Sequence, residues 1–172
     1  APYFRPRSVV CHACFDERYY VSAEEQWLDN SIETWRGLLP AAEDADTVIC
    51  LENVYEREPL HLRRLLEAVA SPRLRFCFDT GHAHAFGSVG PEAWIAALAD
   101  RLGQVHLHDN HGTADEHLPV GEGNFPFGAR HGKGRRALSY HFSKACLKSS
   151  TFMSLPVMMP AMVMKPVSRS VP

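Results

Sequence analysis

The sequence predicts an α/β fold, a partial parallel (β/α) barrel of about four of the eight βα units, followed by a compositionally foreign C-terminal tail. Short apolar runs alternate with helix patterns over the first 127 residues. Glu52, Asp79 and His106 each close one such run, and each lies 27 residues from the next, about one strand-plus-helix unit. The runs are continuously apolar, which is typical of parallel strands covered by helices.

The first predicted strand spans residues 8–14. The run Ser22-Ala-Glu-Glu25 forms a capping box that opens a helix, and Pro40 is expected to end it. The apolar stripe of this helix recurs at spacings of three and four residues and consists of Trp27, Leu28, Ile32, Trp35, Leu38 and Leu39.

The later elements continue the alternation of strands and helices. They are a strand at 47–51, a helix from Pro59 to the Ser71-Pro72 pair, a strand at 74–78, a helix from Gly90-Pro91 to Leu102 closed by Gly103, and a strand at 104–105. We expect His61, in the second helix, to be a surface residue. Right-handed crossovers would place all four strands side by side and parallel.

Composition divides the chain into two parts. Residues 1–127 hold all 20 acidic residues and 10 of the 18 Lys and Arg, a net charge of −10, whereas residues 128–172 carry +8. All five methionines also follow residue 127. We therefore expect a partial barrel over 1–127 and a foreign, disordered or non-native tail over 128–172; a functional basic tail is the alternative.

Several functional classes are disfavoured. No run is apolar and long enough to span a membrane, and no secretory signal is visible, so we expect a cytoplasmic protein. Because the chain begins at Ala1 rather than Met, we expect that sequence precedes it. Cys11 and Cys14 have redox-motif spacing but follow a strand rather than starting a helix, so reduced thiols are expected, with Cys50 and Cys77 at equivalent places in two strands.

The strand ends carry the candidate chemistry. Residues at the carboxyl ends of successive parallel strands converge on one face, so Glu52, Asp79 and His106 are expected to share one divalent metal ion. Glu52 is also a candidate proton-transfer group. His82 follows Asp79 by three residues in a glycine-containing turn and is expected to reach the same point.

Further potential ligands follow or precede these. Asp115 and His117 lie two residues apart in a loop, His12 ends the first strand, and His108 follows His106 closely. Each has an ordinary structural explanation by itself, such as a turn cap or a polar loop. Together they predict a site for Mn²⁺, Mg²⁺, Co²⁺ or Zn²⁺.

Four motifs resemble the xylose-isomerase-like TIM-barrel superfamily. They are Leu51-Glu-Asn53, Phe78-Asp-Thr-Gly-His82, Val105-His-Leu-His-Asp109 and Asp115-Glu-His-Leu-Pro-Val-Gly-Glu-Gly-Asn124. The superfamily includes sugar-phosphate isomerases and epimerases, ketose 3-epimerases and type IV apurinic (AP) endonucleases. The resemblance runs from about Val9 to Phe127 and is specific for the superfamily rather than for one substrate.

The resemblance implies roles for individual residues. Glu52, Asp79 and His106 match the common metal ligands. His82 matches a substrate-contacting or second-metal position, and we assign His108 to substrate binding with it. Three further residues match additional zinc positions of the endonuclease branch: His12, Asp115 and His117. Glu58 matches a position that contacts substrate in some ketose epimerases.

One departure from the family pattern affects activity. The family's last strand supplies a further glutamate, which is both ligand and base, and no Glu follows Glu122 in this chain. We therefore expect a sugar or sugar-phosphate isomerase/epimerase whose chemistry is weak or absent in this chain alone.

Two alternatives to the isomerase stay open. One is a zinc-dependent AP endonuclease-like phosphodiesterase, which the acidic charge of residues 1–127 disfavours because nucleic-acid partners need a basic surface. The other is an inactive barrel fragment or binding protein. We expect a small sugar substrate, with a homo-oligomer left open.

Overall fold

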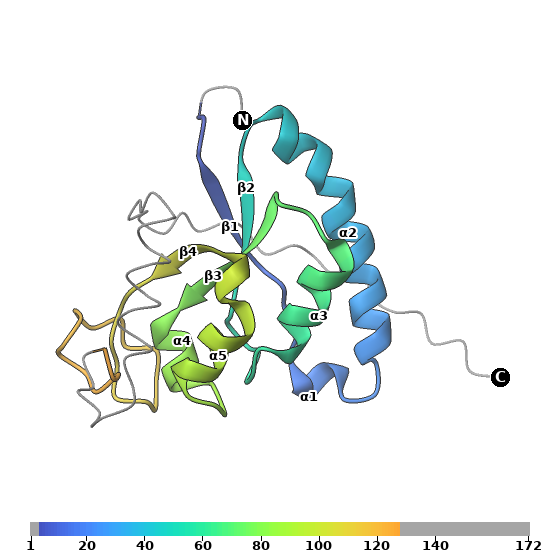
Figure 1. Cartoon of the computed structure of the whole chain (residues 1–172). Coiled ribbons are helices and arrows are strands. Elements are labelled where there is room, and N and C mark those ends of the chain that lie inside the picture. The colour runs from blue at the N-terminus through green and yellow to red at the C-terminus, as the bar shows by residue number, and fades with distance from the viewer. Residues whose placement is uncertain (1–3, 128–172) are drawn as a thin grey trace.

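The computed structural model describes residues 4–127, which form one parallel sheet whose successive strands are connected by helices (Figure 1). The strands are β1 (Ser8–His12), β2 (Val48–Glu52), β3 (Leu74–Asp79) and β4 (Leu102–His106), in the spatial order β1-β2-β3-β4. All three neighbouring pairs are parallel. This architecture confirms the predicted partial (β/α) barrel.

The crossovers contain more helices than the sequence predicted. They are α1 (Glu17–Tyr20), α2 (Glu24–Asp44), α3 (Leu60–Val69), α4 (Thr80–Ala85), α5 (Pro91–Leu98) and a 3₁₀ turn, η1 (Ala99–Arg101). Helices α2 and α3 lie against each other on the same side of the sheet (Figure 1). The main hydrophobic core lies between the helices and the sheet, and its largest fully buried members include Trp94, Phe76, Phe78, Leu51, Leu62 and Leu65.

The sheet is strongly curved. The Ser8 hydroxyl of β1 donates to the side-chain oxygen of Gln104 in β4 at 2.7 Å, although β1 and β4 are not neighbours in the sheet. Side chains from the first and last strands therefore meet across the concave face. This curvature is what a sheet needs to enclose an interior, and it brings the inward side chains of all four strands together.

The start and end of α2 differ from the sequence prediction. Pro40 lies inside the helix, which continues to Asp44 because Ala42 is buried and the N–H groups of Ala45 and Thr47 bond back to Ala41 and Ala42. One proline removes only one helical hydrogen bond, so core packing outweighs it. Ser22 is not the cap either: Ala23 takes that position without a side-chain hydrogen bond, and its backbone N–H bonds back to the carbonyl of Tyr20, the last residue of α1.

Gly103 was expected to close a helix, but it lies within β4. A Cβ atom at this position would lie 2.7 Å from Cβ of Arg75 and 2.8 Å from Sγ of Cys50. Gly103 therefore allows β4 to approach its neighbours at the irregularity between β3 and β4. Leu102, expected as the last helical residue, is the first residue of the strand.

His61 is buried rather than exposed, contrary to expectation. Its ring stacks on Phe15 with centroids 3.6 Å apart, and its Nε2 lies 3.6 Å from a carboxylate oxygen of Glu24. The chain after β1 folds back over α3, which the helix pattern alone does not reveal. The Ser71-Pro72 end of α3 agrees with the prediction, with Ala70 in a left-handed conformation as the cap.

The predicted foreign tail, residues 128–172, lies outside the described residues. Within residues 4–127, no helix combines the length and the apolar character that crossing a bilayer requires.

Candidate metal centre

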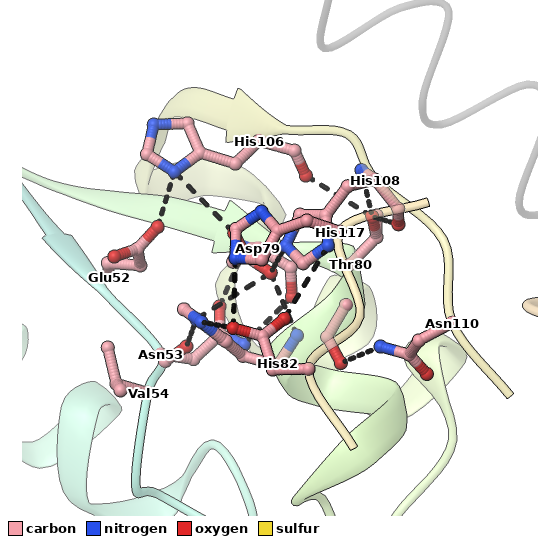
Figure 2. A network of polar contacts seen from close by, with 12 residues as sticks. Glu52, Asn53, Val54, Asp79, Thr80, His82, His106, His108, Asn110 and His117 are labelled. Carbon is pink, nitrogen blue, oxygen red and sulfur yellow. Dashed lines mark hydrogen bonds and ion pairs between the residues drawn. The ribbon is translucent and has the colours of Figure 1, made fainter. Parts of the chain in front are cut away.

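The carboxyl ends of β2, β3 and β4 bring the predicted ligands together (Figure 2). In the strand register, Asp79 of β3 is the lateral partner of His106 of β4, and Glu52 of β2 is the lateral partner of Cys77 of β3. Side chains of register partners in a parallel sheet point to the same face, so these residues all face the concave interior. On the other edge of β2, Glu52 has His12 at the end of β1 as its register partner.

Glu52, Asp79, His106 and His12 form the first group of ligands, and Glu52 lies at its centre. One of its carboxylate oxygens makes a short contact with Nδ1 of His106, and the other lies 3.2 Å from Nε2 of His12. His106 Nδ1 also lies 3.6 Å from an Asp79 oxygen. Glu52 and Asp79 are 5% and 2% exposed, so these carboxylates are shielded from water and directed at imidazoles.

These contacts shift the ionisation of the group. Burial raises the pKa of Glu52, but hydrogen bonds from His106 and His12 outweigh burial and hold it below its ordinary value. Burial also raises the pKa of Asp79, but hydrogen bonds from His106 and His108 outweigh it, and the pKa is lowered. Desolvation lowers the pKa of His106, but contacts with Asp79, Cys77 and Glu52 raise it to about 12. A divalent cation would replace the imidazole protons as the neutralising charge.

His82 reaches the same point from α4. Asp79 is the N-cap of this short helix, and its carboxylate accepts from the backbone N–H of His82 at 2.8 Å. The His82 ring donates from Nδ1 to the Asn53 carbonyl at 3.0 Å, which leaves Nε2 3.3 Å from Asp115. Glu52, Asp79 and His82 each offer a ligand atom within 4.8 Å of the others.

The loop after β4 supplies a second group of ligands. His108, Asp115 and His117 join His82 in a cluster whose ligand atoms also lie within 4.8 Å of one another. His108 Nε2 lies 2.8 Å from Asp79, and the His108 and His117 rings stack with centroids 4.0 Å apart (Figure 2). His117 Nε2 lies 2.9 Å from Asp115, so this carboxylate is shared among three histidines.

Within residues 4–127, two buried atoms of this second group have no hydrogen-bond partner. They are Nδ1 of His108 and Oδ1 of Asp115, and they lie 3.6 Å apart. Buried polar atoms are normally paired, and an imidazole nitrogen facing a carboxylate oxygen forms a donor set for Zn²⁺ and similar ions. The residues present therefore fit a divalent cation.

The structure also places the remaining predicted residues. The side chain of His12 is half exposed at the rim of the concave face, and its pKa is raised by the hydrogen bond to Glu52. Glu58 is half-buried in the segment between β2 and α3, and within residues 4–127 no hydrogen bond or ion pair joins it to either group of ligands. Its assignment to substrate binding stays a prediction.

Three buried polar residues that support the site were not predicted. Asn53 bonds both backbone groups of Asp79, and Glu56 accepts from the backbone N–H groups of Phe15 and Val54. Asp109 accepts from the N–H groups of Asn110, Gly121 and Phe125 and so fastens the loop that carries Asp115 and His117. The signal for Asn53 and Asp109 was their presence in the quoted motifs, next to ligands.

The part of the chain that carries both groups of ligands also resembles known proteins. The family model for the xylose isomerase-like TIM barrel matches residues 7–131, which include the four strands of the described residues and both groups of ligands. The chain belongs to this family. Three known proteins illustrate what this chain is similar to.

The uncharacterized protein MJ1311 of Methanocaldococcus jannaschii is 33% identical over 128 residues, which cover 69% of this chain and 43% of that protein. A D-tagatose 3-epimerase-like protein shares 33% identity and a TM-score of 0.60, over 70% of this chain and 48% of that one. TTHB071 of Thermus thermophilus, from a crystal soaked in zinc chloride, shares 31% identity and a TM-score of 0.62, over 72% and 50%. The chain thus spans half or less of the length of each relative.

Proposed function

We propose that this protein is part of a divalent-metal-dependent sugar or sugar-phosphate isomerase or epimerase. The observation that carries the proposal is the convergence of Glu52, Asp79, His82 and His106 at one end of a parallel sheet. The similarity to a D-tagatose 3-epimerase-like protein supports a ketose as the substrate class. The zinc-soaked relative and the orphaned buried atoms support a divalent ion.

Isomerisation or epimerisation requires removal of a hydrogen from the carbon next to a carbonyl and its return elsewhere or from the other side. A divalent ion held by Glu52, Asp79 and His106 would supply Lewis acidity that polarises the substrate carbonyl and stabilises an enediolate. The pKa of Glu52 is held low by two imidazoles despite its burial, so its carboxylate is ionised and able to accept the carbon-bound proton. His82 would orient a substrate hydroxyl, since Nε2 points away from the Asn53 carbonyl.

The test is exchange of carbon-bound hydrogen for deuterium in a panel of ketoses. The protein is first treated with a chelator and then supplied with Mn²⁺, Mg²⁺, Co²⁺ or Zn²⁺. We expect weak or no exchange from this chain alone and metal-dependent exchange from a chain extended by the family's remaining strands, in which Glu52→Gln should lower the rate by about 10²–10⁴-fold, the usual contribution of a general acid or base. Glu67→Gln is the matched control, because Glu67 lies on the surface of α3 in an ion pair with Arg63.

A phosphodiesterase is the second candidate. The cluster of His82, His108, Asp115 and His117 beside Glu52 and Asp79 favours it, because phosphodiesterases commonly place two or more ions near one substrate. The net charge of −10 over residues 1–127 opposes it. Cleavage of abasic DNA without deuterium exchange in any ketose would replace the isomerase proposal. Binding of ketose and metal without either reaction would favour a binding protein.

A further inference from the structure

We propose that Glu52, Cys77 and His106 form a thiolate-containing position for a borderline or soft divalent cation such as Zn²⁺, Co²⁺ or Cd²⁺, beneath the position that the carboxylates of Glu52 and Asp79 share. The inference concerns ion binding alone and does not depend on the reaction. It assigns a ligand role to a cysteine whose sequence context predicts only core packing.

The strand register sets Cys77 apart from the other buried cysteine. Cys50 is the register partner of Arg75, whereas Cys77 is the partner of Glu52 on one side and of Gln104 on the other. Cys50 and Cys77 each lie two residues before a strand-end carboxylate and are both fully buried, as expected, but the stagger of the strands gives them different neighbours. Cys77 lies two residues before Asp79, so both side chains point into the concave interior, with Cys77 one layer deeper.

The distances allow coordination by three different kinds of atom. A carboxylate oxygen of Glu52, Sγ of Cys77 and a ring nitrogen of His106 all lie within 4.8 Å of one another. Zn²⁺ binds oxygen and nitrogen at about 2.0–2.2 Å and sulfur at about 2.3 Å, so the three atoms need to close by about an ångström. Cys77 is fully buried and Glu52 is 5% exposed, so an ion there would be shielded from water on its inner side.

The donor chemistry distinguishes the two positions. At the upper position Glu52 and Asp79 supply two carboxylates beside an imidazole of His82 or His106, a set that suits Mn²⁺ or Mg²⁺ as well as Zn²⁺. At the deeper position Cys77 takes the place of Asp79, and its sulfur ligand selects thiophilic ions. As the sulfur–metal bond forms, the thiol proton is released to solvent, and no oxidant or reductant is required. Because both positions use Glu52, one ion occupies one or the other according to its softness.

The experiment is a Co²⁺ titration of the chelator-treated protein, followed by near-ultraviolet absorption. Bound thiolate gives a sulfur-to-cobalt charge-transfer band that oxygen and nitrogen ligands do not give. We expect the band in the native protein, its loss in Cys77→Ser, and its retention in the matched control Cys50→Ser. A variant that keeps only Cys77, with Cys11, Cys14, Cys50 and Cys146 changed to Ser, should also retain it.

Affinity gives a second measurement. Competition with a chromogenic chelator should show that Cys77→Ser weakens Zn²⁺ binding at least about tenfold, about 1.4 kcal/mol, while Mn²⁺ binding followed by electron paramagnetic resonance changes much less. No charge-transfer band in the native protein, or an unchanged band in Cys77→Ser, would overturn the inference. If Cys77→Ser fails to fold, the variant that keeps only Cys77 decides: absence of the band there rejects the site. Absence of ketose exchange in the extended chain with the band intact would reject only the isomerase.

Discussion

The side chain of Asn53 binds both backbone polar groups of Asp79. Its amide nitrogen donates to the Asp79 carbonyl and its amide oxygen accepts from the Asp79 N–H, each at 2.9 Å. The Asn53 carbonyl also receives Nδ1–H of His82. A single residue after β2 thus sets the positions of two candidate ligands at and after the end of β3, because it fixes the backbone of Asp79 and the orientation of the His82 ring.

Asn53→Ala should therefore weaken metal binding without removing a ligand. Loss of a group that holds metal ligands in place typically lowers metal affinity by about 10–100-fold. Calorimetric titration with Zn²⁺ or Mn²⁺ measures the effect. Leu66→Ala is the control, since it removes a fully buried core side chain and should cost about 2–5 kcal/mol of stability with unchanged affinity. Equal affinity losses in both variants would mean that Asn53 acts only through overall stability.

Two neighbouring glutamates should behave oppositely. Glu56 is 3% exposed, and its two oxygens accept from Phe15 and Val54 at 3.0 Å each, so Glu56→Ala leaves two backbone N–H groups unpaired. We expect a loss of roughly 2–5 kcal/mol in the free energy of unfolding by urea. Glu58→Gln should leave that free energy unchanged and raise the KM for ketose. A stability loss in Glu58→Gln would contradict its assignment to substrate binding.

Asp109 should make the fold sensitive to acid. Burial raises the pKa of its carboxyl, but hydrogen bonds from Phe125, Gly121 and Asn110 outweigh burial and lower it below the ordinary value of 3.8. Because the folded-state pKa is the lower one, the stabilisation is present above the unfolded-state pKa and is lost as the pH falls through the folded-state value. Urea midpoints between about pH 6 and about pH 2 should fall more steeply for the native protein than for Asp109→Asn. Parallel curves would contradict the role of Asp109.

Metal binding should release protons. Although desolvation lowers the pKa of His106, contacts with Asp79, Cys77 and Glu52 raise it to about 12, so the ring is protonated at neutral pH and must lose a proton to bind an ion. We expect affinity to rise with pH, and titrations in buffers of different ionisation enthalpy to show proton release. Adding metal to 100 times its Kd should stabilise the fold by about 2.7 kcal/mol, and a chelator should reverse this. Affinity independent of pH would contradict the protonated state.

The spacing of Glu52, Asp79 and His106 was sufficient to predict one shared edge, because parallel strands joined by right-handed crossovers leave few other arrangements. The apolar runs did not show which side chains face inward. That choice is made by the register of pairing, which placed Cys77 beside Glu52 and required Gly103 in a strand. The burial of His61 depends on a loop folding over a helix, a contact between distant segments that local patterns do not encode.

The strand register described above also has a consequence for folding fidelity. A slip of one residue in β2, β3 or β4 would turn Glu52, Asp79 or His106 towards the helices and bring an apolar side chain into the interior. A chelated ion would be lost in each slipped arrangement but retained in the native one. A bound ion would thus stabilise the native strand register relative to the slipped ones, so refolding with metal should produce fewer misaligned chains than refolding with a chelator.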